Sequence, residues 1–141
     1  MIVSFDMAMK LKKKGFVEPC IYAYCKSGGW NKYRGIHEPI TYILRTDGNP
    51  FGSYYTGKNW NKEYKPNKNK IQCSAPTISQ VLRWLRTEKK IHLTVDAERE
   101  DWFEYKIVQL SKNARMSSTK VYADYDDAMI GGLEYVLKNL I

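Results

Sequence analysis

The chain has 141 residues, 43% of them hydrophobic, and a formal net charge of +8. This length and composition suit one domain with a real core, so we expect residues 1–141 to form a single domain. No apolar run approaches the roughly 20 residues that a membrane span needs. Lysines 10 and 12–14 leave no apolar signal core near the N-terminus, so we expect a cytoplasmic protein that does not bind membranes.

The positive charge is placed unevenly along the chain. Residues 1–75 contain 13 lysines and arginines against 5 acidic residues, whereas residues 76–141 contain 10 of each. All the excess positive charge therefore lies in the first half. Such asymmetry indicates an anionic partner, although net charge also serves solubility.

The N-terminal segment predicts a helix from Ser4 to about Lys14. The hydroxyl of Ser4 can cap the first turn, and Gly15 suits the left-handed position that ends many helices. Phe16 can then fold back onto the helix. The lysines at its end indicate a solvated last turn, where cations favour the helix dipole, with a phosphate-binding edge as the alternative.

The next segment predicts two strands and a long loop. Residues 20–24 form a plausible strand that the Ser27-Gly28-Gly29 sequence interrupts. Residues 40–44 form a second strand, which a turn at Asp47-Gly48-Asn49-Pro50 ends. Residues 53–56 are expected to pair back onto that strand as a hairpin. Residues 57–69 are too polar for a core and predict a long surface loop.

The clearest periodicities occur between residues 77 and 110. Thr77 can cap a helix that ends near Lys89, with apolar residues at helical spacing. Residues 91–95 and 103–107 alternate between apolar and polar side chains, as half-buried strands do. The acidic residues 96–101 between them predict the turn of an antiparallel hairpin. Val108 and Leu110 change parity, which indicates a bulge or a strand buried on both faces.

The C-terminal segment predicts a third strand and a final helix. Residues 111–118 are polar and indicate a connection, and residues 119–123 favour a strand. Asp124 can cap the last helix, whose expected buried stripe extends to Leu140. Gly131 and Gly132 lie inside this helix, where each costs about 1 kcal/mol relative to alanine. A close approach to the sheet or to another helix would explain why both are tolerated.

These elements predict an α+β fold. We expect a single antiparallel sheet of roughly four to six strands, with the N-terminal, central and C-terminal helices packed mainly on one face. An exposed edge of such a sheet would permit a homodimer.

Several short motifs resemble those of a known group of proteins. They occur in the same order along the chain, at residues 11–16 (Leu-Lys-Lys-Lys-Gly-Phe), 18–20 (Glu-Pro-Cys), 75–77 (Ala-Pro-Thr), 84–86 (Trp-Leu-Arg) and 125–128 (Tyr-Asp-Asp-Ala). Together they resemble small uncharacterised proteins of bacterial phages and integrated mobile elements. The resemblance is weakest from residue 26 to residue 70. It rests on caps and core positions, so it implies no activity and no catalytic residues.

The residues that carry chemistry do not form a familiar constellation. The odd number of cysteines and their wide spacing indicate reduced, partly buried thiols, because zinc requires closely convergent ligands. Neither His37 nor His92 has a spacing that pairs it with a cysteine nucleophile. The acidic residues 96–101 lack the pattern of a calcium loop, and no phosphate-binding loop or hydrolase serine motif is present. We therefore expect no metal, no cofactor and no catalytic residues.

The middle of the chain interleaves aromatic and cationic side chains. Single-stranded nucleic acid needs this combination, because rings stack on bases and cations follow the phosphates. The candidate binding residues are Trp30, Lys32, Tyr33, Arg34, Tyr54, Tyr55, Lys58, Trp60, Lys62, Tyr64 and Lys65. The alternative is that the rings anchor a polar loop to the body while the lysines keep it soluble.

We therefore expect a small non-catalytic accessory or adaptor protein of a phage or mobile element that binds a protein partner, whose identity the sequence does not indicate. The alternative is a module that binds single-stranded nucleic acid through residues 26–70. An enzyme of an unrecognised type is the third hypothesis.

Overall fold

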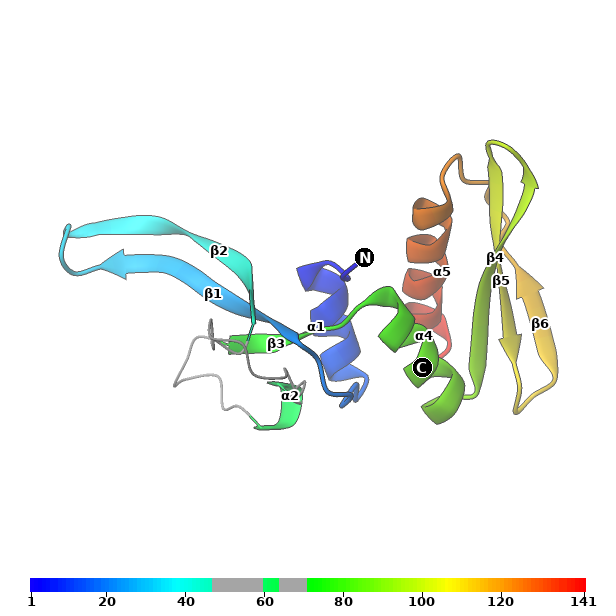
Figure 1. The fold of residues 1–141 in the computed structure, drawn as a ribbon, viewed down its shortest axis with the longest axis horizontal. Coiled ribbons are helices and arrows are strands. Elements are labelled where there is room, and N and C mark those ends of the chain that lie inside the picture. Colours follow the sequence, from blue (N-terminus) through cyan, green and yellow to red (C-terminus); the bar gives the residue numbers. More distant parts are fainter. Residues whose placement is uncertain (47–59, 64–70) are drawn as a thin grey trace. The chain divides into compact units, whose positions relative to one another are not determined.

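The computed structural model describes residues 1–46, 60–63 and 71–141 (Figure 1). The chain divides into two compact units, Met1–Ile78 and Ser79–Ile141. Each unit contains a three-stranded antiparallel sheet. The α+β class is thus confirmed, but the expected single sheet is wrong. Whether residues 1–141 act as one domain stays a prediction.

The first helix, α1 (Phe5–Lys13), follows its sequence signals closely. The Ser4 hydroxyl accepts a hydrogen bond from the Met7 amide, as predicted for the cap. Gly15 adopts a φ of +84°, and the Phe16 amide donates to the Leu11 carbonyl. This geometry turns the chain so that the Phe16 ring is fully buried. One lysine of the run, Lys12, donates to the Gln72 carbonyl.

The sheet of the first unit has the strand order β2-β1-β3. It consists of β1 (Tyr22–Asn31), β2 (Ile36–Thr46) and β3 (Ile71–Ala75). Because β3 is short, it pairs only with residues 22–25 of β1. Beyond that point β1 and β2 continue as a two-stranded ribbon (Figure 1).

Helix α1 packs against this first sheet. The Phe5 ring stacks on Tyr42 with ring centroids 3.7 Å apart, and it meets Tyr24 edge-on at 5.5 Å. The Tyr24 hydroxyl donates a buried hydrogen bond to the Val3 carbonyl. These contacts fix the start of the ribbon on the body of the unit.

Several sequence predictions for the first unit are wrong. The Ser27-Gly28-Gly29 sequence bends β1 but does not end it, and β3 was not expected. The strand predicted at residues 40–44 is longer, and it pairs with β1. Residues 53–56, its expected partner, lie outside the described residues. Within the predicted loop, residues 60–63 form a short helix, α2 (Trp60–Glu63).

The second unit is a meander of three strands with helices before and after it. It contains α4 (Ile78–Glu88), β4 (Ile91–Arg99), β5 (Trp102–Gln109), β6 (Ala114–Ser117) and α5 (Tyr125–Asn139). The strands follow the order β4-β5-β6, and α5 lies along one face of this sheet (Figure 1). The Asp124 carboxylate caps α5 by accepting from the amides of Asp126 and Asp127, as predicted.

The hairpin of β4 and β5 confirms the central prediction, with different limits. Strand β4 extends to Arg99, so only residues 100–101 form the turn. The register shift lies between Ala97 and Arg99, so the bulge that was one of two interpretations of the parity change at Val108 is not found there. The third strand of this sheet is β6, which lies within residues 111–118, the segment predicted as a connection. Of residues 119–123, Tyr122 forms only an isolated bridge with Phe103.

The paired glycines of α5 lie where the helix approaches the sheet, as expected. A Cβ atom on Gly132 would lie 2.7 Å from Leu93 Cδ1 and 3.0 Å from Tyr105 Cβ. A Cβ atom on Gly131 would meet the ring and hydroxyl of Tyr122. Glycine therefore allows α5 to pack directly on β4 and β5.

Candidate binding surface

The ribbon formed by β1, β2 and their turn, residues 22–46, is here called the arm. From Lys26 to Tyr42 the arm has no third strand in the part of the chain that the structure describes. It carries four cationic residues, Lys26, Lys32, Arg34 and Arg45, against the single carboxylate of Glu38. The arm therefore has a net charge of +3 and projects from a unit whose net charge is +8.

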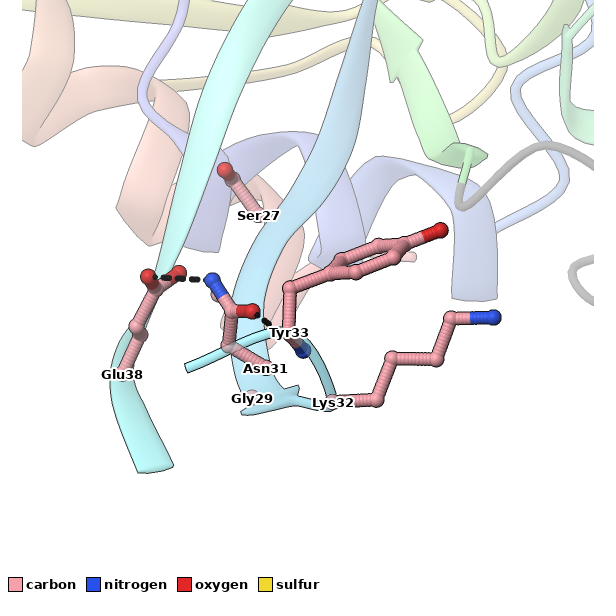
Figure 2. Close-up of a pocket in the computed structure, with 7 residues that line it drawn as sticks. Ser27, Gly29, Asn31, Lys32, Tyr33 and Glu38 are labelled. Carbon is pink, nitrogen blue, oxygen red and sulfur yellow. Dashed lines mark hydrogen bonds between the residues drawn. The ribbon is translucent and has the colours of Figure 1, made fainter. Parts of the chain in front are cut away.

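The turn of the arm is built around Asn31. The Asn31 side-chain oxygen accepts hydrogen bonds from the amides of Tyr33 and Arg34, at 3.1 Å and 3.2 Å (Figure 2). Its side-chain nitrogen donates to Glu38 Oε1 at 2.8 Å. The Asn31 carbonyl accepts from Gly35, which adopts a φ of +66°. Asparagine and glycine are suited to these positions, so the turn is locally specified by sequence.

The turn presents an aromatic ring between two cations. The Tyr33 side chain is 89% exposed. The Lys32 ammonium lies 5.1 Å from the centre of the Tyr33 ring, and both side chains extend to the same side (Figure 2). Arg34 lies 3.9 Å from Glu38, an exposed pair that adds little stability. Lys32, Tyr33 and Arg34 thus lie together in one turn, and their role in binding stays a prediction.

A bulge interrupts the arm below its turn. Ser27 pairs with Thr41, whereas Gly29 pairs with Glu38, so Pro39 and Ile40 together oppose Gly28. Gly28 adopts a φ of +89°, and a Cβ atom there would collide with the Pro39 carbonyl. Bulges bend a ribbon and interrupt the regular ladder of backbone hydrogen bonds. Proline is tolerated at such a position because no regular ladder bond is lost.

Strand β2 carries several large apolar side chains that are partly exposed to solvent. Ile36, Ile40, Tyr42, Ile43 and Leu44 are each between 36% and 52% exposed. In the described ranges, β2 has β1 on one side and no strand on the other. An apolar strand at the edge of a sheet is a template for pairing with another chain.

An open depression lies beside the turn. It has a volume of about 400 Å³ and is lined by the glycines of β1 together with Ser27, Asn31, Lys32, Tyr33 and Glu38 (Figure 2). Most of these lining groups are polar or charged. Pockets for small organic ligands are predominantly apolar and enclosed, so this depression does not have their character.

One predicted binding residue is in the interior. Trp60 is 4% exposed, and its ring nitrogen donates to the Cys20 carbonyl at 2.7 Å. The neighbouring Asn61 donates to the Phe16 carbonyl and accepts from the Ser74 amide. Trp60 therefore anchors α2 to the unit and is not available for stacking on a base. For this residue the alternative interpretation holds, in which the ring attaches a polar segment to the body of the protein.

The remaining candidates are only partly located. The backbone of Trp30 pairs with His37 in the arm, and Lys62 lies in α2, but their side chains are outside the description. Tyr54, Tyr55, Lys58, Tyr64 and Lys65 lie outside the described residues. Of the eleven candidates, three are therefore placed together on a surface.

No protein-family model, curated protein or solved structure matches this chain.

The three cysteines are buried and reduced, as predicted. Burial raises the pKa of the Cys20 and Cys73 thiols to about 12. A thiol with such a pKa is almost entirely protonated near neutral pH, so these side chains are unsuited to nucleophilic chemistry. Among the described residues, no three histidine, cysteine or acidic side chains converge as metal ligands would.

Two features of the surface were not predicted from the sequence. The first is the exposed apolar strand β2, because isoleucine and leucine in a strand usually indicate burial. The second is a separation of charge within the second unit, whose net charge is zero. Eight of its ten carboxylates lie in residues 96–104 and 124–127. The bridge between Phe103 and Tyr122 brings these two segments to the same end of the unit.

Proposed function

We propose that this protein is a small non-catalytic adaptor of a phage or mobile element, and that it binds a protein partner through the arm. The observation that carries the proposal is the exposure of the apolar side chains of β2 on an edge strand. Burial of such side chains contributes about 25 cal/mol per Å² of apolar surface removed from water. Contiguous exposed apolar residues rimmed by polar groups are typical of protein interaction sites.

The construction of the arm supports the same proposal. Its turn is fixed by the hydrogen bonds of Asn31, and its start is fixed by the rings of Phe5, Tyr24 and Tyr42. A surface that is ordered before binding loses less conformational entropy when a partner docks. The arm therefore has both apolar contact area and a defined shape.

Affinity selection with a displayed library of bacterial protein fragments tests the proposal. The full chain should retain fragments that a variant with Ile36→Ser and Ile43→Ser binds at least about tenfold more weakly, because the variant loses exposed apolar area at both ends of β2. A matched control carries Leu110→Ser and Val121→Ser, which remove exposed apolar side chains of the second unit. If retained fragments bind all three proteins equally, the arm is not the binding surface.

The second candidate function is binding of single-stranded nucleic acid at the turn of the arm. The exposed Tyr33 ring, with Lys32 and Arg34 beside it, favours this candidate. A base can stack on the ring while the cations contact adjacent phosphates.

Titration with a labelled oligothymidylate distinguishes this candidate. Binding should weaken as salt rises, because released counterions drive phosphate contacts. Tyr33→Ala should weaken it by about 1–3 kcal/mol, the usual contribution of one stacked base. Tyr125→Ala, which removes a half-exposed ring from the second unit, serves as the control. No binding at low salt would exclude this candidate and leave the protein-binding proposal intact.

A further inference from the structure

The arm also indicates how a partner would bind, and this inference rests on the proposed function. We infer that the partner contributes an extended, apolar segment with net negative charge, which adds as a strand to β2 along residues 41–46. The bulge at Pro39 and Ile40 limits this added strand at its outer end.

The edge of β2 is divided into two runs. The inner run, Thr41–Thr46, contains six residues in regular pairing with β1. The outer run, from Ile36 to Glu38, contains three residues before the bulge. Strands in globular proteins have a typical length of five or six residues, so only the inner run is long enough for regular pairing.

The bulge makes continuous pairing across both runs unfavourable. Pro39 has no amide hydrogen to donate, and the two residues that oppose Gly28 break the alternation of the ladder. Natural sheets use bulges and prolines to restrict which part of an edge can pair. A strand added to the inner run therefore ends at Pro39.

The side chains of the inner run define the apolar character of the partner. Tyr42, Ile43 and Leu44 are consecutive and each is partly exposed, so both faces of β2 present apolar surface. One side of the Tyr42 ring is already covered by Phe5. A partner strand with apolar side chains on both faces would extend this surface, and its main-chain groups would pair with the edge.

The charge of the arm defines the second property of the partner. The only carboxylate of the arm, Glu38, is already bound to the Asn31 amide and lies near Arg34. The arm therefore has four cationic residues that can attract an acidic peptide, and its sequence contains no second carboxylate that could attract a cationic one. Complementary charge favours an acidic segment and disfavours a second copy of this arm, because like charges repel.

Selection from a library of random displayed peptides of about nine residues tests this inference, since that length covers the six-residue run. The full chain should enrich apolar peptides with net negative charge. Ile43→Lys should weaken their binding at least about tenfold, because the loss of apolar contact in the inner run outweighs the attraction of one added cation to an acidic peptide. Ile36→Lys, the same substitution beyond the bulge, should change binding less than about threefold. Circular dichroism of both variants identifies any loss of folding.

A second measurement does not depend on those variants. N-methylation of alternate backbone amides in a selected peptide should abolish binding on one parity and leave it intact on the other, because only one set of amides faces β2. Equal effects on both parities, enrichment of basic peptides, or peptides that depend on Ile36 and not on Ile43 would overturn the inference. Concentration-dependent dimerisation that Ile43→Lys abolishes would also overturn it, by assigning the edge to a second copy. Fragments that the variant with Ile36→Ser and Ile43→Ser still binds more weakly would leave the proposed function standing.

Discussion

Gly28 is the residue on which the shape of the arm depends most directly. It combines a φ of +89°, which L-residues rarely adopt, with a position where an added Cβ atom would collide with the Pro39 carbonyl oxygen. The neighbouring Gly29 has a φ of +101° but nothing within 4 Å of the position that a Cβ atom would take. A side chain at either position would strain the backbone, but only a side chain at Gly28 would also collide with a neighbour.

Alanine at these two positions gives the first prediction. Gly29→Ala should destabilise the unit by roughly 1–3 kcal/mol, the cost of holding a non-glycine residue in a sparsely populated conformation. Gly28→Ala should cost more, because the backbone of Pro39 must also move. Urea unfolding of both variants measures the difference. Equal free energies of unfolding would mean that the collision at the bulge has no energetic weight.

The buried thiols of Cys20 and Cys73 give a prediction on pH. Each has a pKa raised from 9.0 to about 12 in the folded chain, because burial disfavours the thiolate. Between these values the unfolded chain releases the thiol proton and the folded chain keeps it. The unfolded state then binds fewer protons, so the free energy of unfolding falls as pH rises from about 9 to about 12.

A variant with Cys20→Ala and Cys73→Ala tests this dependence. It should be less stable than the natural chain at pH 8, because two buried side chains are shortened. Its stability should nevertheless fall less steeply above pH 9. The slope of the free energy of unfolding against pH, measured by urea titration, decides the matter. Parallel slopes would contradict the assigned role of the thiols.

Helix α5 and the sheet beneath it illustrate packing between elements. Gly131 and Gly132 are adjacent, but their neighbours differ in mobility. A Cβ atom on Gly132 would press on Tyr105 Cβ, which is tied to the backbone of β5. A Cβ atom on Gly131 would press on the outer part of the Tyr122 ring, which can rotate away.

The two alanine substitutions should therefore have different effects. Each gains about 1 kcal/mol of helix propensity. Gly132→Ala should still destabilise the chain, because overpacking a core costs typically 1–3 kcal/mol. Gly131→Ala should be nearly neutral, because the Tyr122 side chain can shift. Thermal unfolding monitored by circular dichroism measures both. A higher melting temperature for Gly132→Ala would contradict the close approach.

The elements differ in how well local sequence specifies them. The helices α1 and α5 were predicted accurately, because Ser4, Gly15 and Asp124 act through neighbours within one turn. The strand limits were predicted less well, because a strand depends on partners distant in the sequence. Nothing local marks residues 71–75 as a strand. Their pairing with residues 22–25 decides it.

The same distinction applies to the candidate surface. Lys32, Tyr33 and Arg34 lie together because they are consecutive in a tight turn, and their role in binding stays a prediction. Trp60 was grouped with them by composition, although its ring nitrogen donates to the Cys20 carbonyl, 40 positions earlier in the chain. The exposure of β2 could not be predicted, because its place at an edge of the described sheet, with β1 on one side only, is set by tertiary pairing.

At the scale of the whole molecule, the two units differ in net charge and in the apolar strand that the first unit exposes. The first unit carries the net charge of +8 and the exposed apolar strand. The second unit has no net charge, and most of its carboxylates gather at one end. We therefore assign binding to the first unit.

Hydrogen–deuterium exchange of the full chain, with and without a fragment obtained by affinity selection, tests this assignment most directly. The proposal predicts that the fragment slows amide exchange within residues 22–46 and leaves residues 79–141 unchanged, because only the arm becomes covered. Slower exchange confined to residues 79–141, with the arm exchanging as fast as in the free protein, would contradict it.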